Sequence, residues 1–387
     1  MRWIVSPTSG WEYSNPVRIL FGAGRLGELA TLVGGRVLVV TTQGATRRGL
    51  TRRVTDQLQA SGVHDGVRPN PTLADVDRAI AEWRGKPIDA IVALGGGSAI
   101  DVGKVLSLAL VAPDFALRRL LMADHPWDAT EPLPLVAVPT TAGTGSEVTP
   151  FATLWDGEAR KKLSVTTPRL HPSFALIDPE LALTLPWDAT LATGLDAYSQ
   201  CFEAICNRNA TPITTTLAEL GIRLVPDALR ALRSDPTSTQ ARSEMAEAAL
   251  MSGLAISHTR TGLAHSISYP VTAHFGVPHG LACALALPAV LAFNIETDDG
   301  RLASVAADVG LDGPTALVPD LLELYDHLGV ADALRPHLPD VGSLASLASE
   351  MLTPGRADNN IRPADIQDVM RILDATERWL TESAAPS

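Results

Sequence analysis

The sequence is poor in the features that mark a nucleic-acid or membrane protein. It has 31 Lys and Arg residues against 43 Asp and Glu, a formal net charge of −12, whereas binding to nucleic acid or an anionic membrane requires clustered basic residues. No uninterrupted apolar stretch reaches the roughly 18 residues that a membrane-spanning helix needs, and the opening MRWIVSPTSGWEY lacks the apolar core of a signal peptide. We therefore expect a soluble, cytoplasmic protein whose partner is a small molecule, not nucleic acid or membrane.

Cysteine is also scarce. Cys201, Cys206 and Cys283 are the only three. They lack CxxC spacing and cannot all pair, so the sequence predicts neither a disulfide framework nor a thiolate zinc site. Apolar residues, by contrast, are abundant: 46% of the 387 residues are hydrophobic. A chain of this length and composition is expected to form more than one domain.

Two kinds of pattern divide the chain near residue 185. Before it, apolar strands within RVLVVTTQG, IDAIVALGGGS and LPLVAVPTTAGTGSE end in polar or glycine-rich loops, and helical periodicity covers 47–62 and 99–110. This alternation predicts βαβ units around a parallel sheet buried on both faces. We therefore expect an α/β dinucleotide-binding domain over 1–185. Residues 186–387 are rich in Ala and Leu and show almost no strand pattern, which predicts an all-α second domain.

Two loops at predicted strand ends carry groups suited to a nucleotide. VALGGGSAID places three glycines and Ser98 before a helix that contains Asp101 and Lys104. Backbone N–H groups there, with the helix N-terminus, favour an anion such as pyrophosphate; a tight turn that needs positive φ explains the glycines equally well. Because two such loops in one sheet converge on the ligand crevice of an open α/β fold, the second loop favours a nucleotide. PTTAGTGSEVT contributes the hydroxyls of Thr140, Thr141, Thr144, Ser146 and Thr149.

The end of the first apolar strand bears on the choice of cofactor. An acidic residue there would bind an unphosphorylated ribose and repel a 2′-phosphate. The chain instead has Thr42, with Arg47 and Arg48 beyond it. NADPH is therefore permitted beside NADH, although two arginines that only solvate a helix start are an equal explanation.

The second half holds a cluster of polar residues in apolar surroundings. Asp196 and Gln200 lie one helical turn apart in GLDAYSQCFEAI, so two oxygen-bearing groups share a face. A lone histidine in such a segment is more often a satisfied core residue than a ligand. An Asp and a Gln joined by two histidines, however, supply four donors of the kind that a divalent cation takes. The stretch TRTGLAHSISYPVTAHFGVPHG contributes Arg260, His265, Tyr269, His274 and His279.

Five of these stretches together carry a family resemblance. GGGSAIDVGK, PTTAGTGSEVT, IDPELALTLP, TGLDAYSQCFEA and VPHGLACAL resemble, in order and spacing, the iron-containing (group III) alcohol dehydrogenase family, from RILFGAGRL to ADNNIRP. The resemblance implies an α/β domain with a parallel sheet and a dinucleotide-binding crevice, an all-α C-terminal domain of the dehydroquinate synthase-like fold, a metal in the cleft between them, and a homodimer. It implies reduction of a small aldehyde by NADH or NADPH with metal assistance.

The resemblance also assigns residues. The metal, Fe²⁺ with Zn²⁺ as the alternative, would be held by Asp196, Gln200, His265 and His279. The cofactor would be contacted by Thr42, Asn70, Gly96, Gly97, Ser98, Asp101, Thr140, Thr141, Thr144, Thr149, Phe151, Lys162 and Leu181.

Two positions depart from the family. It usually has histidine where Gln200 and Tyr269 stand, and a glutamine amide oxygen is a weaker donor than imidazole. Related maleylacetate reductases look like members that work without the usual ligands, so a metal-independent enzyme is an alternative. Since Asp196 and both histidines are kept, we expect a bound metal.

The stretches EAICNRNATP, ISHTRTGLAHSISYP and TAHFGVPHGLACA are similar to the phosphonoacetaldehyde reductase branch, which implies production of 2-hydroxyethylphosphonate. We predict Arg260 inside an apolar helical segment, where a guanidinium is costly unless it is paired with an acid or aimed at an anion. Arg208 and Lys161 are further candidates for the anion. Tyr269 or His274 could relay the proton to the alkoxide, though ordinary packing explains either residue as well.

Three other functions fit parts of the pattern. They are a general alcohol or diol dehydrogenase of the same family, a relative of the glycerol-1-phosphate or 3-dehydroquinate synthase type, and a catalytically silent binding protein.

Overall fold

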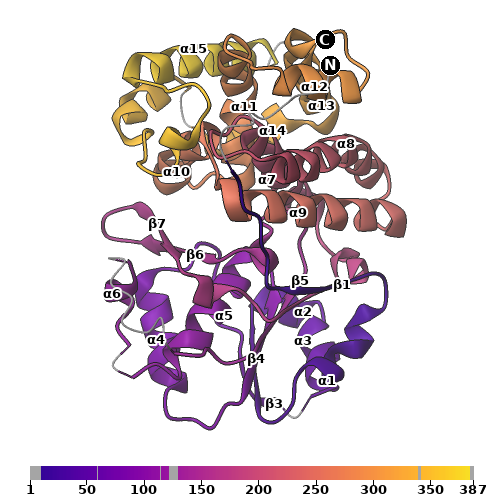
Figure 1. Cartoon of the computed structure of the whole chain (residues 1–387), viewed down its shortest axis with the longest axis vertical. Coiled ribbons are helices and arrows are strands. Elements are labelled where there is room, and N and C mark those ends of the chain that lie inside the picture. The colour runs from indigo at the N-terminus through magenta and orange to yellow at the C-terminus, as the bar shows by residue number, and fades with distance from the viewer. Residues whose placement is uncertain (1–9, 59, 114, 122–129, 339–340, 384–387) are drawn as a thin grey trace. The chain divides into compact units, whose positions relative to one another are not determined.

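The computed structural model describes residues 10–58, 60–113, 115–121, 130–338 and 341–383 (Figure 1). Contacts among them form two compact units. The α/β unit comprises residues 15–185 and 237–246, and the helical unit comprises residues 10–14, 186–236 and 247–383. The main division lies between Leu185 and Pro186. Residues 10–14 belong to the helical unit and residues 237–246 to the α/β unit, and no pattern in the sequence indicated either assignment.

The α/β unit is built on a parallel six-stranded sheet of order β1-β8-β5-β4-β2-β3. In every strand pair the partners run in the same direction, as expected where helices form the crossovers. In sheet order the strands are β1 Arg18–Phe21, β8 Phe174–Ile177, β5 Leu135–Pro139, β4 Ala90–Gly95, β2 Val37–Thr41 and β3 Ala60–His64.

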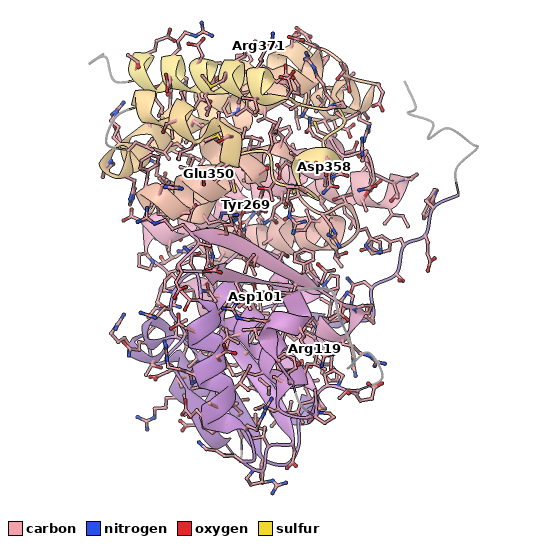
Figure 2. All side chains as sticks on the ribbon, turned by 90° about the vertical axis from the view of Figure 1, so that its left-hand side faces the viewer. Asp101, Arg119, Tyr269, Glu350, Asp358 and Arg371 are labelled. Carbon is pink, nitrogen blue, oxygen red and sulfur yellow. The ribbon has the colours of Figure 1, made fainter. Side chains whose placement is uncertain are left out.

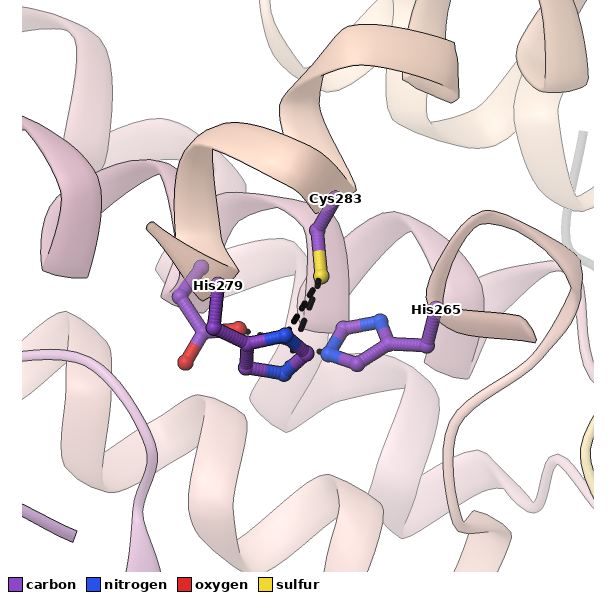
Figure 3. A group of neighbouring side chains, drawn as sticks. His265, His279 and Cys283 are labelled. Carbon is purple, nitrogen blue, oxygen red and sulfur yellow. Dashed lines mark hydrogen bonds and ion pairs between the residues drawn. The ribbon is translucent and has the colours of Figure 1, made fainter. Parts of the chain in front are cut away.

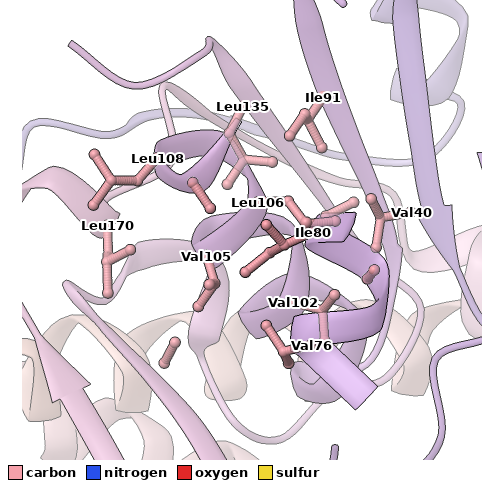
Figure 4. Packing of buried hydrophobic residues seen from close by; sticks show 14 of the residues in the cluster. Val40, Val76, Ile80, Ile91, Val102, Val105, Leu106, Leu108, Leu135 and Leu170 are labelled. Carbon is pink, nitrogen blue, oxygen red and sulfur yellow. The ribbon is translucent and has the colours of Figure 1, made fainter. Parts of the chain in front are cut away.

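Helices bury both faces of this sheet. Val40 and Ile91 face one apolar cluster, drawn in part in Figure 4, while Val39 and Val92 face another. Successive side chains of a strand point to opposite faces, so a continuous apolar run is needed to fill two cores. The helices of the unit are α1 Leu29–Leu32, α2 Gln43–Arg47, α3 Leu50–Thr55, α4 Leu73–Trp83, α5 Gly97–Ala109 and α6 Leu117–Leu121, with 3₁₀ turns at Arg25–Glu28, Ser146–Val148, Pro168–Leu170 and Pro179–Ala182.

Two parts of this unit differ from the sequence-based prediction. The helix expected over 47–62 is wrong: Gly49 has φ +76°, which separates α2 from α3, and the chain turns extended again for β3. The predicted pattern also lacked an antiparallel hairpin formed by β6 Phe151–Asp156 and β7 Lys161–Thr166. Its strands alternate buried and exposed residues only weakly, which makes the signal hard to read.

The helical unit confirms the class predicted for the second half. It consists of helices and loops, with an isolated bridge between Asn207 and Asn360. No helix in the described ranges combines the length and the apolar character needed to cross a membrane. The helices are α7 Trp187–Ile205, α8 Pro212–Ser234, α9 Thr239–Thr259, α10 Leu263–Phe275, α11 His279–Ile295, α12 Arg301–Asp308, α13 Leu317–Leu328, α14 Val330–Leu334 and α15 Ile366–Glu382, with 3₁₀ turns at Pro314–Ala316, Arg335–His337, Val341–Glu350 and Ala357–Asn359.

Candidate metal centre and cofactor loops

Helix α7 carries a buried polar face. Asp196, Gln200 and Glu203 are each about 3% exposed and lie at i, i+4 and i+7, so they follow one face of the helix. Buried carboxylates are costly unless they are paired or coordinate a metal. The side chains that meet this face therefore decide what it does.

Three side chains from α10 and α11 meet Asp196 on this face of α7. One donor atom each from Asp196, His265, His279 and Cys283 lies within 4.8 Å of the others, and Figure 3 shows the histidine rings and the sulfur pointing toward one another. His265 Nε2 lies 3.3 Å from Asp196 Oδ1, and the two imidazole ring centres are 5.3 Å apart. The structure thus brings together three of the four residues expected to bind metal and adds Cys283.

Glu203 holds His265 in place from behind. Its Oε1 accepts a hydrogen bond of 2.9 Å from the backbone N–H of His265, and its Oε2 pairs with the ring Nδ1. Such a carboxylate keeps Nδ1 protonated and leaves Nε2 as the lone-pair donor facing Asp196. Burial by itself would lower the pKa of His265, but its interactions with Cys283 and Glu203 outweigh the burial, and the pKa is raised well above its usual value. A divalent cation would compete with that proton.

A close approach of two helices places His279 in the cluster. A Cβ added to Gly280, at the start of α11, would lie 1.8 Å from the carbonyl oxygen of Ala192 and 2.9 Å from Asp196 Cβ. Only glycine lets the two backbones approach this closely. The residue beside His279 therefore fixes the distance between α7 and α11.

Gln200 makes a different contact. Its Oε1 accepts a hydrogen bond from the hydroxyl of Ser252 on α9. Both residues are buried, so this bond satisfies a polar group that would otherwise be costly to bury. That Gln200 is a metal ligand stays a prediction.

The donor set of the cluster fits a divalent cation. A carboxylate oxygen, two imidazole nitrogens and a sulfur are all ligand types for first-row transition metals, and their spacing within 4.8 Å is short enough for one ion to reach all four. The carboxylate behind His265 completes the arrangement seen at many metal-bound histidines.

The two glycine-containing loops lie side by side in the α/β unit. Gly95 at the end of β4 pairs with Pro139 at the end of β5. A Cβ on Gly97 would lie 2.7 Å from Thr144 Oγ1, so the loops touch. Gly97 opens helix α5, which presents its N-terminus at the carboxyl edge of the sheet. This is the arrangement expected of an anion-binding crevice.

A buried lysine fastens the second loop to α5. Lys104 is fully buried, and its Nζ donates to Ser146 Oγ at 2.9 Å, Thr149 Oγ1 at 3.1 Å and the carbonyl of Phe151 at 2.9 Å. Burial lowers the pKa of Lys104 to about 8. Asp101 bonds to the Ser146 hydroxyl and to the backbone N–H of Thr153 at 2.8 Å, and burial raises its pKa. Hydrogen bonds made by two buried residues of α5 therefore hold the second loop in its conformation.

The remaining predicted cofactor residues lie in different settings. Thr42 caps α2 by accepting from the Ala45 N–H, and exposed Asn70 has φ +54°. Lys162 is half-buried on β7, while Leu181 is fully buried. Arg48, which lies near the predicted 2′-phosphate position, donates to Thr140 Oγ1 at 3.3 Å.

Arg260 corrects the sequence reading of its surroundings. It lies not within a helix but between α9 and α10, with φ +61° and an exposed side chain. Contrary to the prediction, the guanidinium is therefore not enclosed in an apolar helical segment. Its left-handed backbone is fixed by hydrogen bonds from Asn207 Nδ2 at 3.4 Å and Thr259 Oγ1 at 2.9 Å to its carbonyl. In the described ranges, Arg260 forms no ion pair with an acidic residue.

Arg356 lies close to Arg260, since the Asn359 side-chain amide donates to the carbonyls of Thr261 and Gly355, both at 2.9 Å. Although the Arg260 side chain is exposed, partial burial of its guanidinium lowers the pKa of Arg260, and the charge of Arg356 lowers it further. Arg356 donates from Nε to the Tyr269 hydroxyl at 3.2 Å, and the Tyr269 ring centre is 6.1 Å from that of His279. Arg260, Arg356, Tyr269 and the donor cluster are therefore neighbours in space, in that order.

The other predicted site residues have separate settings. His274 pairs with Glu350 at 3.1 Å, and Arg208 is exposed, with its backbone N–H bonded to the Asn359 carbonyl. Figure 2 labels Tyr269 and Glu350 in the helical unit and Asp101 in the α/β unit.

Three residues of interest escaped the sequence reasoning. Glu203 had a signal, since it continues the Asp196 and Gln200 face. Cys283 had a weaker one, one turn after His279. Arg356 had none, because it is distant in sequence from every motif.

Comparisons with known proteins agree with this structure. Residues 16–179 match the family model for iron-containing alcohol dehydrogenase, and residues 190–376 match the model for the C-terminal part of the Fe-containing alcohol dehydrogenase family. The chain belongs to the iron-containing alcohol dehydrogenase family. It is an oxidoreductase of the alcohol dehydrogenase and aldehyde reductase kind.

Relatives with different names resemble the chain to similar degrees. It is 36% identical over 361 residues to phosphonoacetaldehyde reductase of Streptomyces viridochromogenes, covering 87% of this chain and 89% of the relative. It is 30% identical over 372 residues to lactaldehyde reductase of Escherichia coli, covering 91% and 96%. The solved sulfoacetaldehyde reductase of Bifidobacterium kashiwanohense, in complex with NAD⁺, has a TM-score of 0.84 and 30% identity, covering 98% of this chain and all of that one.

Proposed function

We propose that the protein reduces a short aldehyde carrying a tetrahedral oxyanion, phosphonoacetaldehyde foremost, to the primary alcohol. NADH or NADPH supplies the hydride, and a divalent cation, Fe²⁺ or alternatively Zn²⁺, is held by the donor cluster. Two of the relatives support the substrate class, because the names phosphonoacetaldehyde reductase and sulfoacetaldehyde reductase both describe aldehydes with such a head group.

The proximity of Arg260 and Arg356 is the observation that carries this proposal. Each guanidinium is permanently charged, and the charge of Arg356 disfavours that of Arg260. The Arg356 side chain donates to the Tyr269 hydroxyl and to the Gly355 carbonyl, and across the described residues neither arginine has a carboxylate partner within ion-pair distance. A phosphonate or sulfonate would relieve the repulsion and accept hydrogen bonds from both side chains.

Tyr269 connects this arginine pair to the donor cluster. Its hydroxyl accepts from Arg356, and its ring lies beside that of His279. With one tyrosine between the two charged regions, a substrate with few bonds between its anionic head and its carbonyl fits best.

The reaction adds one hydride and one proton to the carbonyl group. A cation held by Asp196, His265 and His279 would supply positive charge to stabilise the developing alkoxide. NAD(P)H held at the two glycine-containing loops would supply the hydride for the carbonyl carbon, with its own oxidation to NAD(P)⁺. We assign the proton transfer to the oxygen to Tyr269, because its hydroxyl, the acceptor of the bond from Arg356, can act as an acid and its ring lies beside His279. His274, bonded to Glu350, is the second candidate.

For the cofactor, we propose that the adjoining loops at Gly96–Ser98 and Thr140–Thr144 receive the pyrophosphate. Phe151, Lys162 and Asn70 are further proposed contacts. Thr149 is fully buried and Asp101 is nearly so, so we assign them the task of shaping the loops. By resemblance to the phosphonoacetaldehyde reductase branch, we further propose a cytoplasmic homodimer that acts in phosphonate metabolism.

A substrate comparison tests this function. We expect kcat/KM to be more than tenfold higher for phosphonoacetaldehyde than for acetaldehyde, which is about 1.4 kcal/mol of transition-state discrimination, with NADH and NADPH measured in parallel. Arg260→Ala and Arg356→Ala should each lower the phosphonoacetaldehyde value while acetaldehyde reduction changes little. Arg371→Ala, a surface arginine paired with Asp368, serves as the control.

A preference below tenfold would remove the support for an anionic substrate. It would favour a general alcohol or diol dehydrogenase, the second candidate, which is supported by the similarity to lactaldehyde reductase. Lactaldehyde and 1,2-propanediol in the same assay identify that outcome.

A further inference from the structure

The oxygen of the expected ligand at position 200 already accepts one hydrogen bond. Gln200 Oε1 accepts the Ser252 hydroxyl, and an amide oxygen is a neutral, weak donor compared with an imidazole or a thiolate. A cation held by Asp196, His265 and His279 therefore gains little from this side chain and needs a stronger fourth donor.

Cys283 is placed to be that donor. It lies on α11 at i+4 from His279, so both side chains share one face of the helix. Its sulfur is 3.8 Å from the His279 ring nitrogens and within 4.8 Å of the donor atoms of Asp196 and His265 (Figure 3). The side chain is fully buried, its thiol donates to Ser268 Oγ at 3.4 Å, and it also contacts the His265 side chain.

The other cysteines have no such setting. Cys206, at the end of α7, is buried, and it is not among the clustered donors. Because it is buried and free like Cys283, a change at Cys206 controls for the loss of a buried thiol without touching the cluster.

We propose that the Cys283 thiolate is the fourth protein ligand of the metal, alongside Asp196, His265 and His279, and that Gln200 is not a ligand. When the ion binds, a metal–sulfur bond forms and the thiol proton passes to solvent. A thiolate is a soft ligand, so the site should shift in preference toward zinc and cobalt relative to a site of nitrogen and oxygen donors. The proposal rests on the proposed function only in requiring a bound divalent cation; it is independent of the substrate.

Cobalt substitution tests it without any turnover. The full-length protein, stripped with a chelator and titrated with Co²⁺, should develop a sulfur-to-cobalt charge-transfer band in the near ultraviolet that saturates at one equivalent. Cys283→Ala should lose the band and bind Co²⁺ at least ~10-fold more weakly, because even residues that only orient a ligand contribute that much. Gln200→Ala and Cys206→Ala should keep the band.

Three results would overturn the proposal. They are stoichiometric cobalt binding without the band, a band that survives Cys283→Ala, and a band lost in Gln200→Ala while its circular dichroism and thermal midpoint are unchanged. Cys283→Ser, nearly the same size, shows whether an effect of Cys283→Ala arises from a cavity. A failure of the substrate comparison leaves the band unaffected, whereas an absence of cobalt binding in the wild type rejects the metal centre itself, so the two proposals fail distinguishably.

Discussion

Glu203→Gln tests how the protein orients its proposed metal ligand. In the wild type both carboxylate oxygens accept hydrogen bonds from His265, one from the backbone N–H at 2.9 Å and one from ring Nδ1. Glutamine has nearly the same shape but only one acceptor atom. The NH₂ group of the glutamine must therefore face either the backbone N–H or the ring Nδ1–H of His265. One hydrogen bond is lost, and two N–H groups face each other in its place.

The size of the effect follows from the contacts. A hydrogen bond to a charged group contributes about 1.5–3 kcal/mol, and a buried donor left unpaired carries a penalty of similar size. Loss of the carboxylate behind a metal-bound histidine typically weakens metal binding 10- to 100-fold, about 1.4–2.7 kcal/mol. We therefore expect Glu203→Gln to lower zinc affinity by ~10- to 100-fold and the free energy of unfolding by ~2 kcal/mol.

Competition with a chromophoric chelator measures the affinity. Denaturant unfolding of the metal-free protein measures the stability separately, so an affinity change caused by unfolding can be recognised. Glu323→Gln, an exposed change on α13, is the matched control and should leave both quantities unchanged. Wild-type zinc affinity in Glu203→Gln would refute the argument that this carboxylate prepares His265 for a metal.

Three further changes probe the framework. Gly280→Ala forces a Cβ to within 1.8 Å of the Ala192 carbonyl oxygen, so we expect the variant to lose ~3 kcal/mol of stability and to bind metal more weakly. Gly27→Ala, with open space around it, should change neither stability nor metal affinity. Wild-type stability in Gly280→Ala would contradict the close packing of α7 and α11. Burial raises the pKa of Glu147 to about 7 from 4.5, so the folded state holds this proton more tightly than the unfolded chain and stability falls as pH rises from about 4.5 to 7. At about pH 7, Glu147→Gln should therefore gain up to ~3 kcal/mol in unfolding free energy relative to the wild type, compared with their difference at about pH 4.5. Urea unfolding measures this, and the same pH dependence of stability in both proteins would contradict the prediction. Lys104→Met, which removes two hydrogen bonds to the second loop and one to the start of β6, should raise the Kd for NADH in a fluorescence titration while metal content stays normal.

Local sequence was sufficient to predict the features that depend only on residues close together in the chain. Val39 and Val40 lie in a continuous apolar strand, which can be stable only in a sheet covered on both faces. Asp196 and Gln200 share a helix face because of their spacing alone. The helix over 47–62 was wrong because Gly49, with positive φ, separates two short helices and strand β3 begins at Ala60. The position of Arg260 was wrong because its own positive φ ends α9, although the apolar pattern continues beyond it.

The sequence by itself determined the two classes of domain, the glycine loops and three members of the donor cluster, since periodicity and motif spacing are local properties. Only the tertiary structure decided what meets them: Glu203 behind His265, the Cys283 sulfur near Asp196 and His265, and Arg356 against Tyr269. These contacts join segments far apart in the chain, and they depend on how closely helices such as α7 and α11 pack. That distance is set by the absence of a side chain at Gly280 and the bulk of the residues around it, which no local pattern specifies.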